Sequence, residues 1–450
     1  MSSRVIDSLA TTDALAAAFS DHTLLEAMCA FETALARAEA SAGVMPQAAA
    51  DAIGRAALGS DLDIDRIVAA TRLHGTASIP VVEMIEARVS AVDPEAARWV
   101  HFGATSQDVF DTALVLCLRK AWSSLEADHQ RISDALAGLA RDHAATVMLG
   151  RTLLQPATPI TFGLKAAGWL GAVTRSWTRC VSAYEHATVL QFGGASGTLA
   201  ALGSHGSEVE AALARELDLA IPDAPWHAHR DRLAAFVAAC GIYTGTLGKI
   251  ARDIALLMQH EVGEAFEPGG GSSTMPHKRN PSGCAIVLAA ASRLPGLVAT
   301  MLATLGDEHE RSVGGWHAEG AVVAEATQLT GAAQAAIAHV LENLTVDTAR
   351  MRSNLDATRG VIFAERLRLA IAPAVGRATA ADLVKTAVST AQRSGRTLAD
   401  VVAATPELSA LLSADDITAL VVPETYLGLA DQFRRRLLAA AVDDVASGKR

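Results

Sequence analysis

The chain has 450 residues and a formal net charge of −11, and half of its residues are apolar although only 4% are aromatic. This length is too large for one ordinary hydrophobic core, so we expect two or three domains, or an elongated bundle completed by partners. An apolar fraction carried mainly by Ala, Leu and Val favours closely packed helices and an all-α fold. The acidic charge and the lack of Lys and Arg runs argue against nucleic-acid binding, but a small basic cluster remains compatible with an anionic substrate.

The cysteines predict a chain without disulfides or a structural zinc site. No pair has the spacing of a zinc or redox motif, so we expect reduced thiols in the core. The five residues are Cys29, Cys117, Cys180, Cys240 and Cys284. The N-terminus lacks the continuous apolar stretch of a signal peptide, and no run of about 20 apolar residues stands out elsewhere. We therefore expect a cytoplasmic protein that does not bind membranes.

The first clear helix prediction covers residues 21–40. Apolar residues there, such as Leu25, Met28 and Leu35, recur at the three- and four-residue spacing of an amphipathic helix. Gly43 and Pro46 end this pattern. Shorter helical patterns then continue to about residue 100, separated by glycines and prolines.

Much longer helical patterns fill the middle of the chain. They span residues 106–145, 158–188, 229–262, 281–305 and 314–344. A helix of about 34 residues is about 50 Å long, which exceeds the width of a small domain, so we expect a helical bundle that is shared between subunits. The patterns shorten again near the end. The predicted domains are an N-terminal helical domain at 1–105, a long-helix bundle domain at 106–345 and a small C-terminal helical domain at 346–450.

The least ordinary segment is GGGSSTMPHKRNP, at residues 269–281, between two of the apolar patterns. Its glycines permit positive φ angles and close approach to a ligand, Ser272 and Ser273 supply hydroxyls, and Lys278 and Asn280 are suited to bind carboxylate oxygens. A simple connector between helices is the alternative explanation of this composition. The segment lacks the Walker spacing of a phosphate-binding loop and the Gly-x-Ser-x-Gly context of a hydrolase serine.

Three motifs, in order, resemble the fumarase/aspartase superfamily. They are HFGATSQD at 101–108, GRTLLQPATP at 150–159 and GSSTMPHKRNP at 271–281. The resemblance covers nearly the whole chain. It implies an all-α, three-domain subunit with a long central helical bundle. It also implies a homotetramer whose active sites are shared between subunits, and elimination or addition next to a substrate carboxylate without a metal or other cofactor.

The resemblance also implies roles for individual residues. Ser272 is expected to be the base that removes a proton from the carbon next to a carboxylate, and Lys278 is expected to help lower the pKa of that serine. The carbanion that results is stabilised as an aci-carboxylate. Substrate contacts are expected from His101, Thr105, Ser106, Thr152, Gln155, Ser273, Met275, Asn280 and Arg230.

Two departures from the family pattern indicate which reaction is catalysed. Leu153 stands where several family members have a proton-transferring histidine, and Ala285 stands where a glutamate orients that histidine. A carboxylate leaves without a proton, unlike an amine or hydroxide, so these departures favour a cycloisomerase that acts on a small tricarboxylate. An adenylosuccinate lyase-like enzyme is the alternative within the family. A noncatalytic protein on the same scaffold, and a metal-dependent barrel enzyme, are less compatible with the motifs and the long helices.

Overall fold

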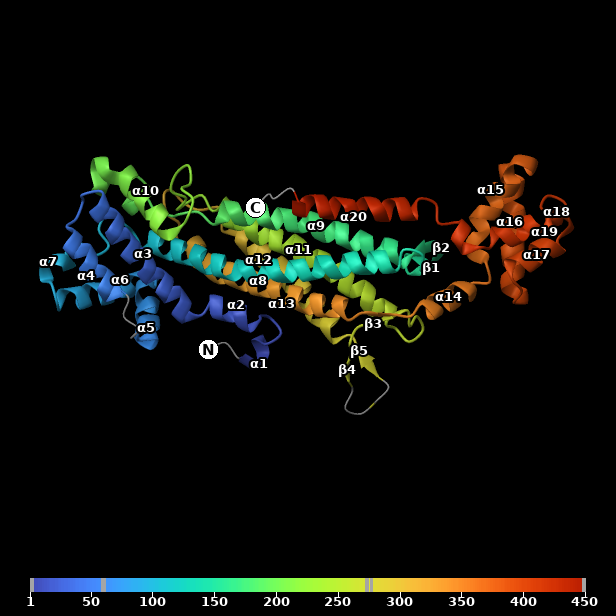
Figure 1. Cartoon of the computed structure of the whole chain (residues 1–450), viewed down its shortest axis with the longest axis horizontal. Helices are drawn as coiled ribbons and strands as arrows, with labels where there is room; N and C mark the ends of the chain where they lie inside the picture. The colour runs from blue at the N-terminus through green and yellow to red at the C-terminus, as the bar shows by residue number, and fades with distance from the viewer. Residues whose placement is uncertain (1–3, 58–61, 272–274, 276–277, 447–450) are drawn as a thin grey trace. The chain divides into compact units, whose positions relative to one another are not determined.

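The computed structural model describes residues 4–57, 62–271, 275 and 278–446, and within these ranges it describes the side chains of residues 5–442 (Figure 1). It divides into two compact units, each assembled from separate parts of the chain. Unit 1 comprises residues 1–130, 176–248 and 285–337, and unit 2 comprises residues 131–175, 249–284 and 338–450. This division does not follow the three domains expected from the sequence, whose boundaries stay a prediction.

Short helices form the N-terminal part of unit 1. Ser20 accepts a hydrogen bond from the amide of Thr23 at 3.2 Å, which caps the helix that follows. That helix, α3, confirms the amphipathic pattern, and it buries Met28, Phe31 and Leu35 in the N-terminal core. The helices are α1 (Arg4–Asp7), α2 (Asp13–Ala18), α3 (Asp21–Ser41), α4 (Gln47–Ala57), α5 (Ile64–His74), α6 (Ser78–Ser90) and α7 (Pro94–Ala97).

Five long helices confirm the five long helical patterns to within a few residues at most ends. They are α8 (Ser106–Asp142), α9 (Phe162–Ala187), α11 (Asp231–Leu257), α12 (Ser282–Ala303) and α13 (Gly315–Glu342). Their residues are divided between the two units. In unit 1 they pack side by side, with Thr244 of α11 donating to Thr330 of α13 at 3.2 Å and Gln334 donating to the carbonyl of Leu125 in α8 at 3.0 Å.

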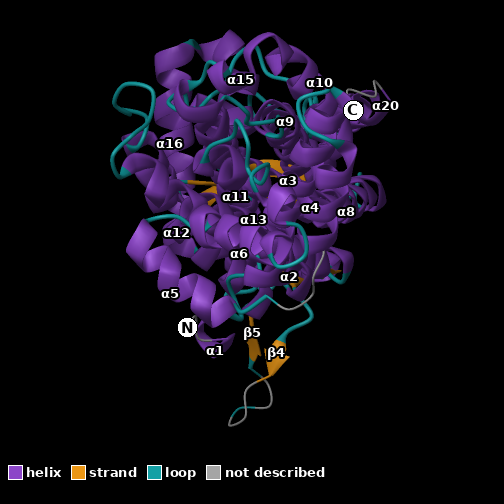
Figure 2. Cartoon of the chain, turned by 90° about the vertical axis from the view of Figure 1, so that its left-hand side faces the viewer, coloured by secondary structure: helices purple, strands orange, loops and turns teal. Residues whose placement is uncertain are grey.

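The fold is dominated by helices, as expected, but short antiparallel strand pairs are present as well (Figure 2). The largest pair joins β1 (Val147–Thr152) to β2 (Gln155–Thr161), inside the second motif. The other pairs join β3 (Ala265–Phe266) to β6 (Thr345–Val346), and β4 (Gly270–Gly271) to β5 (Arg279–Asn280). The all-α fold expected from the sequence contains no strands, so the three strand pairs among the described residues are an addition to the predicted fold.

Between α9 and α11, unit 1 contains two short 3-10 helices, η1 (Gly194–Ser196) and η2 (Ala200–His205), and α10 (Gly206–Leu217). The C-terminal part of unit 2 packs around Leu367, Val384 and Ile417. Its elements are α14 (Thr348–Asp356), η3 (Val361–Phe363), α15 (Ala364–Val375), α16 (Arg377–Ser394), α17 (Leu398–Ala404), α18 (Pro406–Ser409), α19 (Ala414–Leu420), η4 (Pro423–Thr425) and α20 (Ala430–Ala446).

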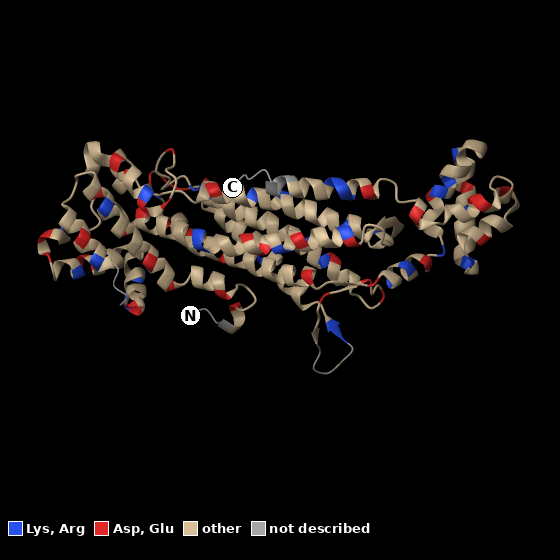
Figure 3. Ribbon diagram, viewed as in Figure 1, with Lys and Arg blue, Asp and Glu red and all other residues tan. Residues whose placement is uncertain are grey.

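The five cysteines are all buried and free, so the prediction that they lie in the core is confirmed. Charges of both signs are mixed along most of the helices (Figure 3). Among the described residues, α11 and α12 are long and apolar enough to cross a membrane by length and composition alone. The most apolar stretch of α11 is 61% buried inside the chain, as in the core helix of a soluble protein, whereas the corresponding share of α12 is 22%. Helix α12 therefore presents an apolar surface.

Candidate active site

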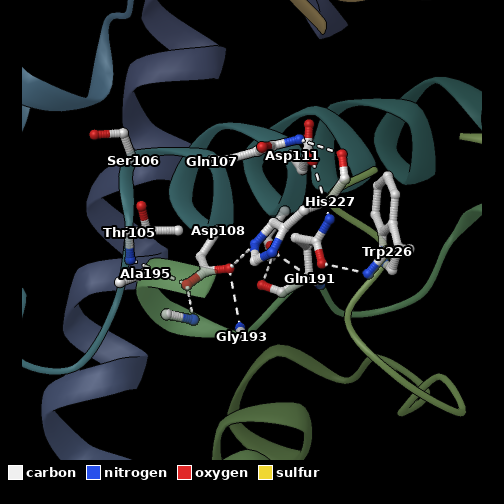
Figure 4. A network of polar contacts seen from close by, with 12 residues as sticks. Thr105, Ser106, Gln107, Asp108, Asp111, Gln191, Gly193, Ala195, Trp226 and His227 are labelled. Carbon is white, nitrogen blue, oxygen red and sulfur yellow. Dashed lines mark hydrogen bonds and ion pairs between the residues drawn. The ribbon is translucent and has the colours of Figure 1, made fainter. Parts of the chain in front are cut away.

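The first motif forms the N-terminus of α8, where Asp108 joins several segments of unit 1 (Figure 4). Its completely buried carboxylate accepts from the amide of Thr105 at 3.0 Å, the capping interaction of an acidic residue in the first helical turn. It also accepts from the amides of Gly193 at 3.0 Å and Gly194 at 2.9 Å. The start of α8 is thereby fixed against the glycine-rich loop at residues 193–197.

His227 is the fourth partner of Asp108. Its Nε2 lies 2.6 Å from Oδ1 of Asp108, and its carbonyl accepts from the side chain of Gln107 at 2.9 Å. Burial raises the pKa of Asp108, and the hydrogen bond and charge of His227 act in the opposite direction, so the pKa stays above its ordinary value. The histidine ring is therefore held rigidly, with Nε2 directed at the carboxylate.

Arg230 lies in a neighbouring buried network. Its guanidinium donates to both carboxylate oxygens of Asp111, at 2.7 and 3.0 Å, and to Glu319 at 2.8 Å. The ring of Trp226 packs under it, 4.5 Å from the guanidinium carbon. The side chain is 1% exposed and its charge is balanced by two carboxylates within the protein. The structure thus accounts for Arg230 without a substrate, and the predicted substrate contact has no support from this geometry.

His101 adopts a left-handed backbone conformation, with φ of 57°, five residues before the start of α8 at Ser106. Its Nδ1 lies 2.6 Å from Oε1 of Glu32, which is buried in α3. Burial by itself lowers the pKa of His101, but the carboxylate of Glu32 and the hydrogen bond to it outweigh this effect and raise the pKa above its ordinary value. The short contact with Glu32 therefore fixes the ring of His101 beside a buried carboxylate.

Thr105 and Ser106 follow this histidine in the chain, at the start of α8, and both are half-buried. The hydroxyl of Thr105 accepts from Arg311 at 2.7 Å. The backbone carbonyl of Ser106 accepts from Ser78 at 2.7 Å, while its side chain points away from the Asp108–His227 pair (Figure 4). His101, Thr105 and Ser106 thus lie in one stretch of unit 1, and their role as substrate contacts stays a prediction.

The second motif forms the β1–β2 hairpin of unit 2. Thr152 and Gln155 pair across a two-residue tip, and both are exposed. Leu153 and Leu154 occupy the tip with positive φ angles of 51° and 64°, and they are 97% and 74% exposed. One pair away from the tip, Arg151 donates to the buried Glu264 at 2.6 and 2.8 Å, which anchors this end of the hairpin.

The two ends of the segment that carries the third motif pair with each other as short antiparallel strands. Gly270 pairs with Asn280, and Gly271 pairs with Arg279. The amide of Lys278 donates to the carbonyl of Met275 at 2.9 Å, and both of these residues are exposed. Asn280 is half-buried. Ser272 and Ser273, the predicted base and a predicted substrate contact, lie outside the described residues.

Glu267 connects this loop to α12. Its buried carboxylate accepts from the amides of Gly283 at 2.8 Å and Cys284 at 3.0 Å, and so caps the helix N-terminus. A side chain at Gly283 would place a Cβ 2.5 Å from the side chain of Val340. The end of the loop is therefore fixed by close packing.

Comparison with known proteins gives the family. A model of the family described as Lyase matches residues 8–296, and a model described as adenylosuccinate lyase C-terminus matches residues 360–437. This chain belongs to the lyase family of the fumarase/aspartase superfamily. The expectation drawn from the three motifs is confirmed.

The relatives of this lyase are similar over nearly its whole length. A 3-carboxy-cis,cis-muconate cycloisomerase of Pseudomonas aeruginosa is 48% identical, covering 94% of this chain and 93% of the relative. A nitrosuccinate lyase of Streptomyces davaonensis is 42% identical, covering 92% of this chain and 90% of the relative. The solved structure of the 3-carboxy-cis,cis-muconate lactonizing enzyme of Pseudomonas putida is 44% identical, with a TM-score of 0.93 and coverage of 98% of this chain and 100% of that chain.

The structure of this lyase adds residues that the sequence analysis did not assign to the site. Four residues contact or position the first motif: Glu32, Asp108, His227 and Arg311. Asp108 is itself the last residue of that motif, and Arg311 lies in the segment EHERS at residues 308–312. The sequence alone does not reveal these contacts. Glu32, for example, lies 69 residues before His101, and only the tertiary structure brings the two side chains together.

Proposed function

We propose that this lyase is a 3-carboxy-cis,cis-muconate cycloisomerase that interconverts 3-carboxy-cis,cis-muconate and 4-carboxymuconolactone, a step in the breakdown of aromatic compounds. The observation that carries the proposal is the similarity to four proteins of this name, which are 41–48% identical over 91–94% of the chain. The family chemistry, an elimination or addition next to a carboxylate, is the chemistry that lactone opening and closure require.

The mechanism is an intramolecular addition and elimination. In lactone opening, Ser272 removes a proton from the carbon beside a carboxylate, the carbanion is held as an aci-carboxylate, and the C–O bond of the ring breaks to release a carboxylate. In lactone closure, a substrate carboxylate attacks the double bond and the carbanion takes up a proton. Attack within one molecule has a high effective concentration, which supplies much of the rate.

The leaving group explains the two departures from the family pattern. A carboxylate departs without being protonated, so the histidine and glutamate replaced by Leu153 and Ala285 are not needed. Lys278 lowers the pKa of Ser272, and Thr105, Ser106, Thr152, Gln155 and Asn280 bind substrate oxygens, with Ser273 and Met275 completing the wall of the site. We assign Arg230 a positioning role, because its charge is already balanced by Asp111 and Glu319.

We further propose a cytoplasmic homotetramer with active sites built from several subunits. The apolar surface of α12 supports this proposal, because only 22% of its most apolar stretch is buried within one chain. The exposure of Leu153 and Leu154 supports it as well. Large apolar side chains at a hairpin tip are costly in water and are suited to contact with another subunit or a ligand.

A second candidate activity is the elimination of nitrite from nitrosuccinate. The 42% identity to a nitrosuccinate lyase lies within the range of the cycloisomerases. Nitrite, like a carboxylate, leaves as a stable anion, so the loss of the proton-transfer pair fits both reactions. The two substrates differ in charge, since nitrosuccinate has two carboxylates and 3-carboxy-cis,cis-muconate has three.

A direct ultraviolet assay separates these functions. Purified protein treated with a chelator is mixed with 3-carboxy-cis,cis-muconate, nitrosuccinate or adenylosuccinate in parallel. Rapid loss of the conjugated diene absorbance, with neither nitrite release nor adenylosuccinate cleavage, is expected. Nitrite release in place of diene loss would assign the second candidate, and adenylosuccinate cleavage would show that another group replaces the missing histidine.

A further inference from the structure

Two arginines beside the first motif differ in how their charges are balanced. Arg230 is buried between the carboxylates of Asp111 and Glu319. Arg311 contacts only neutral acceptors among the described residues: the hydroxyl of Thr105 at 2.7 Å and the carbonyls of Gly194 at 3.3 Å and Ala195 at 3.0 Å. A half-buried guanidinium without a carboxylate partner is suited to bind an anion.

The contacts of Arg311 place it where a predicted substrate contact lies. Because the hydroxyl of Thr105 accepts a hydrogen bond from Arg311, its own proton is available to a ligand oxygen. Both groups lie at the N-terminus of α8, a helix of 37 residues whose dipole favours negative charge at this end. The arginine, the hydroxyl and the helix terminus therefore all favour the binding of a negatively charged group.

The segment that carries Arg311 is held rigidly. The carboxylate of Glu308 accepts from the amide of Val313 at 3.0 Å, and the hydroxyl of Ser312 accepts from the amide of Trp316 at 2.9 Å. The indole of Trp316 donates to Asp111 at 2.9 Å. Since Asp111 also binds Arg230, the buried network fixes the start of α13 and, through it, the position of Arg311.

We propose that Arg311 binds one carboxylate of the substrate together with the hydroxyl of Thr105. This inference rests on the proposed function, and it identifies a residue that discriminates a tricarboxylate from substrates with fewer charges. A substrate with three negative charges needs more than the ammonium of Lys278, and the charge of Arg230 is used within the protein. Arg311 supplies a further positive charge that no carboxylate of the described residues balances.

Steady-state kinetics of Arg311→Gln, Arg311→Lys and wild type with 3-carboxy-cis,cis-muconate test this role. We expect Arg311→Gln to raise KM at least tenfold with a smaller change in kcat, and Arg311→Lys to recover part of that loss, because a charge-assisted contact is removed in the first variant and kept in the second. Arg37→Gln is the matched control. Arg37 is an exposed arginine of unit 1 that pairs with Glu216, and its loss is expected to leave KM within twofold.

Thermal shift with tricarballylate, an unreactive tricarboxylate, gives a readout that does not depend on turnover. Wild type and Arg37→Gln are expected to be stabilised by the same amount, and Arg311→Gln by less than half of it. Equal impairment of the Lys and Gln variants would overturn the charge-based role, as would an unchanged KM and thermal shift in Arg311→Gln. If wild type fails to turn over 3-carboxy-cis,cis-muconate, the proposed function fails, and the tricarballylate shift alone then decides the role of Arg311.

Discussion

Glu39 of α3 is fully buried and neither of its carboxylate oxygens has a hydrogen-bond partner among the described residues. Burial, assisted by the negative charge of Glu32, raises its pKa from 4.5 to about 9. The folded chain therefore holds a proton on Glu39 at neutral pH that the unfolded chain releases. The contribution of this group to stability is complete below pH 4.5 and is lost as the pH rises towards 9.

Replacing Glu39 with Gln is expected to remove this pH dependence. We predict that Glu39→Gln is more stable than wild type by about 5 kcal/mol at pH 8, and that the difference falls to below about 1 kcal/mol near pH 5. Urea denaturation at several pH values measures this. Glu26→Gln, an exposed change on the same helix, serves as the control and is expected to follow wild type. Parallel stability curves for wild type and Glu39→Gln would contradict a protonated Glu39.

Ser272→Ala tests the assignment of the base. The family mechanism gives this hydroxyl the proton-abstraction step, so we predict that turnover falls at least a hundredfold, in the range of about 10²- to 10⁴-fold typical of such a group. Assembly is expected to remain unchanged. Ser282→Ala, which removes an exposed hydroxyl just beyond the loop, is expected to retain activity. Near-normal turnover in purified Ser272→Ala would show that another group is the base.

At the scale of elements, the tip of the β1–β2 hairpin combines two unfavourable features. Leu153 and Leu154 both have positive φ angles, and both are exposed. A two-residue turn of this kind favours Asn-Gly, since non-glycine residues with bulky side chains are strained there. The two leucines therefore indicate that the tip contacts a ligand or another subunit.

A hairpin variant separates stability from function. We predict that Leu153→Asn combined with Leu154→Gly raises the stability of the protein by about 1 kcal/mol, because the new residues fit the turn. The same variant is expected to lower kcat/KM for 3-carboxy-cis,cis-muconate at least tenfold. Denaturation midpoints and steady-state kinetics measure the two effects. Unchanged stability would argue against strain, and undiminished kcat/KM would argue against a place for the tip in the site.

The hairpin also shows where prediction from the sequence ended. The long helices α8, α9, α11, α12 and α13 were predictable, because their apolar residues recur over many turns. The hairpin was not, because Leu153 and Leu154 give no turn signal and its strands are only six and seven residues long. A leucine pair at this turn indicates function only once its backbone angles are known.

The site residues divide in the same way. The first motif places His101, Thr105 and Ser106 near one another because they are close in sequence, and Ser106 begins α8. The motifs gave no indication that Arg230 is neutralised by Asp111, 119 residues away, or that Arg311 contacts Thr105, 206 residues away. An arginine is identical in sequence whether its partner is a protein carboxylate or a substrate, so tertiary structure was needed to distinguish them.

At the scale of the whole molecule, α12 carries the strongest indication of assembly. Its exposed positions include a row of small residues at three- and four-residue spacing, which allows another helix to approach closely. The row is Ala285, Ala289, Ser292, Gly296, Ala299 and Ala303. Such a face on a helix this apolar is expected to be covered by other copies of the chain in the homotetramer.

A charged side chain in this row tests the assembly. We predict that wild type scatters light as a particle of four times the chain mass of 46.7 kDa. Ala289→Glu is expected to form smaller species and to lose at least tenfold in turnover, because burying an unpaired carboxylate between helices costs several kcal/mol and sites shared between subunits are then incomplete. Ala378→Glu, an exposed alanine of α16, is the matched control and is expected to remain tetrameric and active. A fully active monomer, in wild type or in Ala289→Glu, would mean that each chain holds a complete site of its own.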